Sequence, residues 1–304
     1  MSDAPEFVEI DEASFFIGPV LGAAGIPAEF FEGDNLDTIM ETGEAFEYGD
    51  DPNTLILQYP SHEGGVSILL ELDGDAYGLI NAWPFLPQVL NAEVEPLKVA
   101  ASPDGRQAFV TGRVGSAAVV FFDDGYIENA PAYRTGEIFY AQFYGILTQA
   151  SLAEEEEFQV SPGDEGYQEL LESGRVPDEN GVMTISWDDA AGMMPRFDIA
   201  PNAFEFRGPV TAVDPLTDWL VPDTAIVHVT IMRPFSDEDG NPVDEGFDLP
   251  MLIRPEMIEG GALPQPGDEI QGLAFLYGTG FSDDEEDEDE DGAGDQNDGV
   301  PLLS

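Results

Sequence analysis

The chain has no cysteine, a single lysine (Lys98) and only two histidines (His62 and His228) in 304 residues. The absence of cysteine excludes both a disulfide framework and a thiolate metal site. The two histidines lie too far apart in the sequence for the spacing of a zinc motif, and His228 is expected to be a half-buried strand residue. No Gly-x-Ser-x-Gly sequence is present either, so the chain shows no motif of nucleophilic hydrolysis.

Basic residues are scarce and acidic residues are abundant. The chain has 63 Asp and Glu against 9 Lys and Arg, which gives a net charge of −54. Self-repulsion on this scale destabilises a compact state in dilute solution, whereas in molar salt the Debye length falls to about 3 Å and the carboxylates are screened. We therefore expect a halophile-adapted protein from a saline cytoplasm; an acidic mimic of nucleic acid is the alternative interpretation.

The sequence also lacks long apolar runs. Its N-terminal residues are acidic, whereas a secretory signal begins with basic residues. The apolar stretch at residues 15–31 is interrupted by glycines and prolines and is too short to span a bilayer. We expect a soluble, cytoplasmic protein without membrane contact.

One sequence pattern occurs twice, at residues 121–136 (FFDDGYIENAPAYRTG) and 252–267 (LIRPEMIEGGALPQPG). Each copy contains an Ile-Glu step and ends in a glycine followed by an acid. A strand-like run then leads to Tyr-Gly, at Tyr144-Gly145 in one copy and at Tyr277-Gly278 in the other. A strand-like Gly-x-Val segment precedes each copy, at 109–114 and 204–210. The repetition predicts one small barrel-like unit used twice.

Short strands bent by glycines, with one short connecting element, suit an OB-like barrel. The sequence thus predicts a mainly β (β-rich α+β) chain with two small OB-like barrels in tandem. The predicted divisions are an N-terminal α+β segment at 1–100, a first OB-like unit at 101–150, a connector at 151–200, a second OB-like unit at 201–281 and a disordered acidic tail at 282–304. Within the first segment, strands at 54–59, 66–72 and 77–82 predict a meander that follows a helix at 36–48.

Residues 204–278 resemble one half of uncharacterised bacterial proteins built from two OB-like small β-barrel units. The shared pattern is a Phe-x-Phe-x-Gly-Pro-Val strand, a long alternating strand, a Leu-Pro-led strand and a Gly-Asp-x-Ile-x-Gly strand that ends near an aromatic-Gly step. Residues 112–147 are similar to the partner half. The resemblance covers less than half of the chain and implies a fold but no activity.

An OB-like barrel suggests binding of single-stranded nucleic acid or a nucleotide, because aromatic rings can stack on bases while arginines neutralise phosphates. The candidate residues for such a groove are Arg113, Arg134, Tyr126, Tyr133, Arg207 and Arg233. The strongly acidic composition opposes this interpretation, and such tyrosines are more often core and rim residues of a barrel than a stacking platform.

An acidic hairpin tip offers the one candidate metal loop. Its oxygen ligands are Asp237, Asp239, Asn241 and Asp244. A Ca²⁺, Mg²⁺ or Na⁺ ion is the candidate occupant, but glycine falls at the fourth position of the loop and not at the sixth, as an EF-hand requires. A solvated hairpin tip is the alternative.

The carboxylate pairs Asp123-Asp124 and Asp188-Asp189 are candidates for acid–base chemistry, but acids are too frequent in this chain for the sequence to single one out. No catalytic residue and no cofactor is predicted. We expect a non-catalytic module that binds another protein or acts in assembly, with nucleic acid an unexpected partner. The alternatives are an OB-type nucleic-acid or nucleotide binder and a hydrolase with a carboxylate site. The apolar end at 300–303, after its acidic spacer, is either a frayed terminus or a docking peptide.

Overall fold

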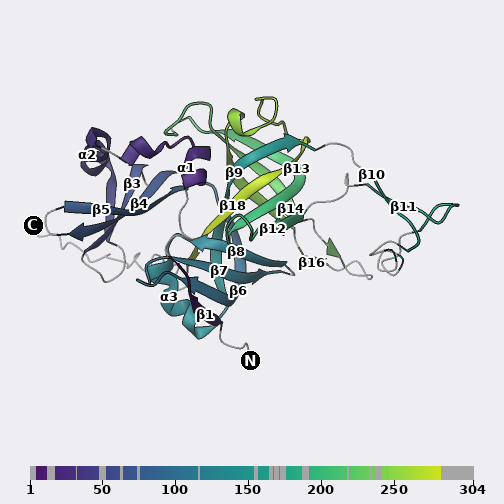
Figure 1. Ribbon diagram of the computed structural model, residues 1–304, viewed down its shortest axis with the longest axis horizontal. Helices are drawn as coiled ribbons and strands as arrows, with labels where there is room; N and C mark the ends of the chain where they lie inside the picture. The colour runs from purple at the N-terminus through teal and green to yellow at the C-terminus, as the bar shows by residue number, and fades with distance from the viewer. Residues whose placement is uncertain are drawn as a thin grey trace, which may run out of the picture.

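The protein is described by a computed structural model, in which more than half of the described residues form strands (Figure 1). The described residues are 5–11, 18–31, 33–47, 53–61, 64–73, 76–115, 117–153, 157–163, 167, 171, 176–186, 192–217, 219–232, 235–236, 242–244 and 246–281. Strands make up 56% and helical residues 14% of this part of the chain, which confirms the predicted mainly β fold class. The predicted acidic tail at 282–304 lies outside the described residues.

The N-terminal segment forms a four-stranded antiparallel sheet with three short helices. Its elements are α1 (Gly18–Ala23), η2 (Ala28–Phe31), α2 (Gly33–Thr42), β2 (Glu44–Glu47), β3 (Thr54–Ser61), β4 (Gly64–Asp73) and β5 (Ala76–Phe85). The strands follow one another in the order β2-β3-β4-β5; β3, β4 and β5 form the predicted meander, whereas β2 lies within the helix predicted at 36–48. Side chains alternate along β3, so that Leu57 lies under α2 while Ile56 and Gln58 face the opposite side. The sheet therefore has one face covered by a helix and another turned toward the rest of the molecule.

The next elements form a closed circuit of five strands, completed by the last strand of the chain. They are β6 (Leu90–Ala101), β7 (Ala108–Val114), β8 (Ala117–Asp123), α3 (Tyr126–Thr135), β9 (Phe139–Leu152) and β18 (Glu269–Phe281). The strand order is β6-β7-β8-β18-β9, and β9 pairs back onto β6, with Phe143 opposite Leu90. Strand β18 runs parallel to β8. We call this circuit the first barrel.

A second closed circuit follows the same order. Its own elements are β13 (Ala203–Pro215), β14 (Ala225–Met232), β17 (Phe247–Ile253), η4 (Pro255–Met257) and again β18. The order is β13-β14-β17-β9-β18, and β18 pairs back onto β13, with Phe275 opposite Ala203. Strand β9 runs parallel to β17. In this second barrel the fifth strand comes from the first unit, just as β18 completes the first barrel.

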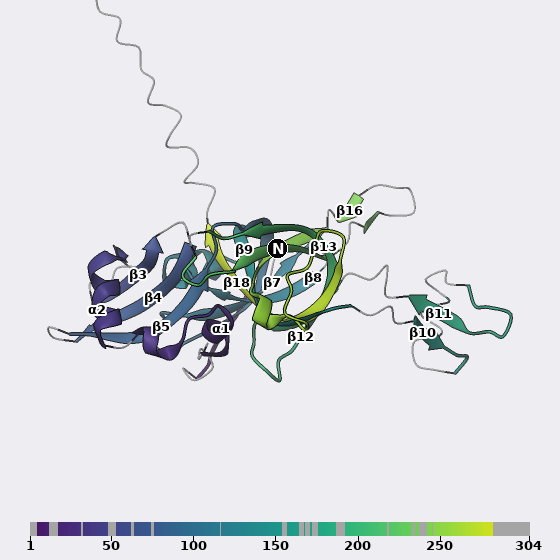
Figure 2. The same ribbon diagram turned by 90° about the horizontal axis from the view of Figure 1, so that it is seen from above.

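The two barrels meet at the long antiparallel pair β9–β18, which both share (Figures 1 and 2). Tyr144 lies directly opposite Tyr277, and their rings stack with centroids 5.5 Å apart. Immediately beyond this pair, β9 joins β17 at Gly145 and β18 joins β8 at Gly278. A β-carbon at Gly145 would lie 2.5 Å from the Met251 side chain, and one at Gly278 would lie 3.0 Å from the Gln142 carbonyl oxygen, so the repeated Tyr-Gly step marks a point with little room for a β-carbon.

The predicted correspondence between segments 109–114 and 204–210 is wrong. Segment 109–114 lies in β7, the second strand of its unit, whereas 204–210 lies in β13, the first strand of its unit. By strand order, β13 corresponds to β6. Gly112 closely approaches Val94 of β6, whereas Gly208 closely approaches Thr230 of β14. Glycine marks a close approach in both places, but the Gly-x-Val pattern does not indicate which neighbouring strand lies close to the glycine.

The structure places two further elements differently from the predicted divisions. Strand β6 begins at Leu90, within the segment assigned to the N-terminal unit, and belongs to the first barrel. Strand β12 (Gly192–Pro195), within the predicted connector, pairs with β13 of the second barrel. Hydrogen bonding to strands that are distant in sequence sets both positions, and composition alone does not reveal such pairings.

Three small elements lie at the periphery. Strand β1 (Glu6–Glu9) runs parallel to β6. The pair β10 (Glu157–Val160) and β11 (Met183–Ser186) projects from the second barrel, and β15 (Phe235–Ser236) pairs with β16 (Pro242–Asp244) (Figure 2). Within the described ranges, no helix combines the length and the apolar character needed to cross a bilayer.

Strand alternation divides the buried side chains into two cores. Phe121 points into the first barrel, whereas its neighbour Phe122 points outward and packs on Trp83 of β5, with ring centroids 5.3 Å apart. Tyr144 and Tyr277 belong to the same outer core as Trp83. The N-terminal sheet is thus packed against the outside of the barrels beside the shared strand pair.

Candidate functional site

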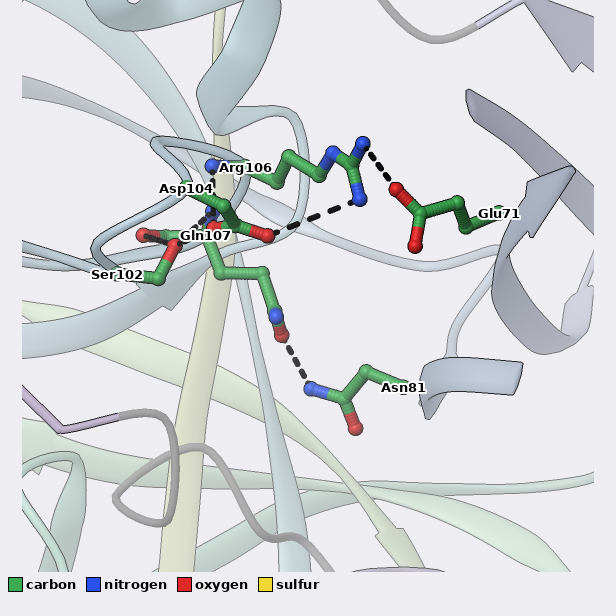
Figure 3. A network of polar contacts seen from close by, with 6 residues as sticks. All are labelled: Glu71, Asn81, Ser102, Asp104, Arg106 and Gln107. Atoms are coloured by element: carbon green, nitrogen blue, oxygen red, sulfur yellow. Dashed lines mark hydrogen bonds and ion pairs between the residues drawn. The ribbon is translucent and has the colours of Figure 1, made fainter. Parts of the chain in front are cut away.

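A polar network fixes the N-terminal sheet against the turn between β6 and β7 (Figure 3). Arg106 of this turn forms an ion pair of 2.7 Å with Glu71 of β4. Asn81 of β5 donates a hydrogen bond to the side-chain carbonyl of Gln107, and the backbone N–H of Gln107 donates to the Ser102 hydroxyl at 3.0 Å. These contacts join β4 and β5 of the N-terminal sheet to the β6–β7 turn of the first barrel.

A cavity of about 370 Å³ lies between this inner face and the first barrel. Both walls contribute apolar and polar groups. The lining residues are Phe46, Ile56, Gln58, Ser67, Trp83, Phe85, Leu86 and Val89 on the sheet side, and Asp124, Gly125, Glu128, Gln142, Tyr144 and Thr279 on the barrel side.

Two consecutive aspartates follow the buried part of β8 and point in different directions. Asp123 is fully buried and faces α3. Its carboxylate accepts a hydrogen bond of 2.5 Å from the Tyr133 hydroxyl, one of 3.0 Å from the Gly125 N–H and one of 3.2 Å from the Asn129 amide. Asp123 therefore ties the start of α3 and the tyrosine near its end to the third strand of the barrel.

Asp124 faces the opposite way, onto the wall of the cavity. The Tyr144 hydroxyl of β9 lies 3.0 Å from the Asp124 carboxyl and 3.1 Å from the backbone carbonyl of Pro84 in β5. A tyrosine hydroxyl has only one proton. When Asp124 is ionised it competes with Pro84 for that proton, whereas a protonated Asp124 can donate to the tyrosine oxygen and leave the tyrosine proton for Pro84.

Burial is the main influence on the protonation of both carboxyls. It raises the pKa of Asp123 to about 7, against the opposing effect of its three hydrogen bonds. It also raises the pKa of Asp124 to about 7, although this residue reaches the cavity wall, and the adjacent Asp123 carboxylate adds to the increase. Burial beside these carboxylates likewise raises the pKa of Tyr133 and of Tyr144. Near neutral pH, Asp124 can therefore act as a hydrogen-bond donor or as an acceptor.

Trp83 is the main aromatic residue of the sheet wall. It is 1% exposed, and its indole N–H has no hydrogen-bond partner among the residues that the structure describes. Buried donors normally have a partner, but this nitrogen is itself shielded from solvent, so another part of the Trp83 side chain and not its N–H borders the cavity.

The tyrosines predicted for base stacking lie in the core of the first barrel. Tyr126 is 4% exposed and Tyr133 is fully buried, and their rings lie parallel with centroids 6.1 Å apart. They stack on each other, and neither presents a face to a ligand.

The predicted arginines are placed on several different elements. Arg113 of β7 pairs with Glu95, and Arg207 of β13 pairs with Glu269 at 2.8 Å. Arg134 lies in the last turn of α3, at the other end of the first barrel from Arg113, because β7 begins opposite Asp123 and ends at Val114. Arg233 lies outside the described residues. The described arginines do not form one groove with the two tyrosines.

Most of the predicted metal loop is outside the described residues, which exclude Asp237, Asp239 and Asn241. Asp244 is described as part of β16, without its side chain. In the described ranges, no three His, Asp or Glu side chains are grouped so as to hold a metal ion. His228 lies 2.7 Å from the Gln88 side chain and 3.3 Å from Asp214, as suits a strand residue with polar partners.

The sequence named Asp123 and Asp124 as one of two candidate carboxylate pairs without singling them out, named Tyr144 only as part of the repeated Tyr-Gly step, and did not indicate Trp83 as a site residue. The available signal was position: the two acids directly follow a run of apolar β residues and precede a glycine. An acid at the end of a buried strand indicates a specific role more strongly than an acid in a loop does, because acidic side chains are rarely buried without a partner. Trp83 reaches the cavity wall through tertiary packing, which no local sequence pattern indicates.

Comparison with known proteins gives no relative: no family model, no curated protein and no solved structure matches this chain. The resemblance to two-barrel bacterial proteins stays a prediction.

Proposed function

We propose that this protein is a non-catalytic module that binds another protein, and that the cavity between the N-terminal sheet and the first barrel is its anchor pocket. The observation that carries the proposal is a cavity of about 370 Å³ at the junction of two structural units. Ligand pockets typically have volumes of about 300–1,000 Å³, are mainly apolar and contain a few convergent polar groups. Phe46, which is 43% exposed, provides apolar surface beside the cavity for a macromolecular partner.

The test compares two identical substitutions at different places. Gln58→Trp places a large ring at the cavity wall, whereas Gln149→Trp places the same ring on an exposed position of β9 outside the cavity. Partners are captured from lysate in molar salt with the wild type and with each variant. We expect at least a tenfold loss of the captured partner for Gln58→Trp alone, since filling an anchor pocket removes the central contact. Equal capture by all three proteins contradicts the proposal.

A second candidate is an enzyme that uses Asp124 as a general acid or base. The observation in its favour is that burial raises the pKa of this cavity-lining carboxyl to about 7, near the value that suits proton transfer at neutral pH. Glu128 is the other acid on the same wall. The test is to measure turnover and binding of a substrate in the wild type and in Asp124→Asn. Loss of turnover with retained binding in the variant favours this candidate over the binding module.

The strand order supports an OB-like assignment for both barrels. In each, the first strand pairs with the second and the fourth, the fifth lies between the third and the fourth, and a helical segment connects the third to the fourth. Nucleic-acid binding receives no comparable support from the described arginines and tyrosines.

We also propose a halophile-adapted, cytoplasmic protein, on the basis of the net charge of −54. Screening in concentrated salt weakens the repulsion between surface carboxylates. The melting temperature is expected to rise from dilute buffer to molar potassium chloride. An unchanged or lower melting temperature in salt contradicts this part of the proposal.

A further inference from the structure

The junction between the N-terminal sheet and the first barrel contains a hydrogen bond that can exist in two forms. We propose that the protonation of Asp124 controls how tightly the sheet is held against the barrel, and thereby access to the cavity between them. With Asp124 protonated, Tyr144 of the barrel donates its proton to the sheet and the junction is closed. With Asp124 ionised, Tyr144 donates to Asp124 instead, and the junction loosens on the cavity side.

The Tyr144 hydroxyl lies between one acceptor in each structural unit. It is 3.0 Å from the carboxyl of Asp124 in the first barrel and 3.1 Å from the backbone carbonyl oxygen of Pro84 in β5 of the sheet. A tyrosine hydroxyl has one proton to donate, and a backbone carbonyl can only accept. A carboxyl group accepts when ionised and can donate when protonated. Both hydrogen bonds are therefore complete only when Asp124 carries a proton.

Burial and stacking hold the tyrosine ring in this position. Tyr144 is 3% exposed, and its ring stacks on Tyr277 with centroids 5.5 Å apart. Pro84 is also buried, so solvent does not readily replace the tyrosine as a donor to its carbonyl. The hydroxyl thus stays between its two acceptors, and the position of one proton decides which unit receives the bond.

The surroundings of Asp124 set the pH at which the bond changes. The titratable and polar groups that face it are Asp123 on β8, Tyr144 on β9, Glu128 and Tyr133 on α3, and Tyr277 and Thr279 on β18. Among the described residues that line the cavity, none is Lys, Arg or His. Burial and the adjacent Asp123 carboxylate raise the pKa of Asp124 to about 7. Docking of the sheet is therefore expected to be firm at lower pH and to weaken as pH rises through this value.

A second set of contacts keeps the two units together when this bond is lost. Arg106 pairs with Glu71 at 2.7 Å, and Asn81 donates a hydrogen bond to Gln107. None of these four residues is among those that line the cavity, whereas Tyr144 is. Loss of the Tyr144 bond should therefore loosen the cavity side of the junction without separating the sheet from the barrel.

Trp83 provides the readout, because its ring packs on Phe122 across the junction with centroids 5.3 Å apart. It is 1% exposed, so a soluble quencher reaches it only when the junction opens. The chain has three tryptophans, and Trp187→Phe/Trp219→Phe leaves Trp83 as the sole fluorescent indole. This full-length reference protein is compared in molar salt, from pH 5 to pH 9, with the same protein carrying Tyr144→Phe or Asp124→Asn. Acrylamide quenching is measured for each.

The two variants should shift the quenching in opposite directions. In the reference protein, quenching of Trp83 should increase roughly fivefold from low to high pH, because one hydrogen bond contributes modestly to docking. Tyr144→Phe lacks the bridging hydroxyl and should be quenched strongly at every pH. Asp124→Asn is uncharged at every pH, and its amide can donate to the tyrosine oxygen. It should therefore be quenched weakly throughout.

The pH profiles also define the results that would overturn the proposal. Quenching that does not change with pH in the reference protein overturns it, and so does an equal change with pH in the reference protein and in Asp124→Asn. Far-UV circular dichroism at each pH identifies any protein that unfolds. If Tyr144→Phe unfolds, the comparison between the reference protein and Asp124→Asn decides alone. No ligand takes part, so the result is independent of whether the cavity binds a partner protein.

Discussion

The two barrels share one strand order but differ where the third strand leads into the fourth. In the first barrel, β8 ends in Asp123 and is followed by α3, a helix of 10 residues with Tyr126 and Tyr133 buried. In the second, β17 ends in Ile253 and is followed by η4, which has 3 residues and no buried side chain. The cavity opens at the first of these connections. The strand order, which both barrels share, therefore does not determine where the cavity lies. The connection between the third and fourth strands does.

The difference has a local cause. The buried carboxyl of Asp123 holds the first turn and the later tyrosine of α3 through hydrogen bonds. At the end of β17, Ile253 is 1% exposed and packs as an apolar residue, and the following Arg254, whose side chain is 14% exposed, pairs with Glu256 at 3.0 Å. A polar anchor thus accompanies the longer helix of one connection, whereas the connection that follows the apolar Ile253 contains only the short η4.

The most damaging change should be one that breaks both barrels at once. Gly145→Val would place a β-branched side chain against Met251, at the point where β9 passes from one barrel to the other. Overpacking of a core costs up to about 3 kcal/mol, and a shared strand should spread the damage to both units. Chemical denaturation in molar salt measures the loss. Gly192→Val is the matched control, because a side chain there would contact nothing within 4 Å. Loss of structure in one barrel alone would contradict the shared framework.

The asymmetry between the connections can be tested by substituting their end residues. Asp123→Ala leaves the Tyr133 hydroxyl and the Asn129 amide without their buried acceptor and should lower the free energy of unfolding by about 2–3 kcal/mol. Ile253→Val removes one methyl group from an apolar site and should cost about 1 kcal/mol. Both are measured by denaturation in the same salt. An equal cost at the two positions would mean that Asp123 does not anchor α3.

The acidic connection should also make stability depend on pH. Burial raises the pKa of both Asp123 and Asp124 to about 7, so the folded state binds more protons than the unfolded state between the ordinary value of 3.8 and about 7. Stability contributed by these groups is therefore present at low pH and decreases as pH rises through that window. The slope is at most about 1.4 kcal/mol per pH unit for each carboxyl.

The contribution of this pair is obtained as a difference, because the exposed carboxylates titrate as well. Free energies of unfolding are measured from pH 4 to pH 8 for the wild type and for Asp123→Asn/Asp124→Asn. We expect the curve of the double variant to be flatter than that of the wild type. Parallel curves would show that neither carboxyl has a raised pKa in the folded state.

The smallest effect concerns one ion pair from each barrel. The Arg113 side chain is 51% exposed in its pair with Glu95, whereas that of Arg207 is 13% exposed in its pair with Glu269. Arg113→Gln should cost less than about 0.5 kcal/mol and Arg207→Gln about 1 kcal/mol, because exposed pairs are weakened by solvent and salt. Denaturation at two salt concentrations measures both. The prediction is contradicted if the stability loss depends more strongly on salt for Arg207→Gln than for Arg113→Gln, because the Arg207 pair would then be the more strongly screened one.

The sequence was sufficient for the features that depend on local pattern. The meander of β3, β4 and β5 follows from alternating apolar residues and turn signals, and Gly136 and Gly267 both adopt the positive φ, 68° and 96°, that a repeated glycine suggests. Alternation shows which side chains share a face, but not which strand lies beside them. For this reason the exchange of β9 and β18 and the correspondence of β13 with β6 were not predicted.

The site was less accessible to sequence reasoning than the fold. Gln58 and Thr279 line one cavity although they lie at opposite ends of the folded chain. The candidate groove of arginines and tyrosines was based on residue type, and the structure buries Tyr126 and Tyr133 because α3 packs its aromatic side chains into the first barrel. Only the position of Asp123 and Asp124 after an apolar strand carried local information.

The reciprocal use of β9 and β18 limits how this molecule can have originated. A half-length polypeptide with β6 to β9 alone has four strands and an open seam where β18 belongs. Two such halves close each other's seams by trading their final strands, so a single-copy ancestor would be a dimer before it was a fused chain. The two stacked tyrosines lie on the line where two such halves would meet.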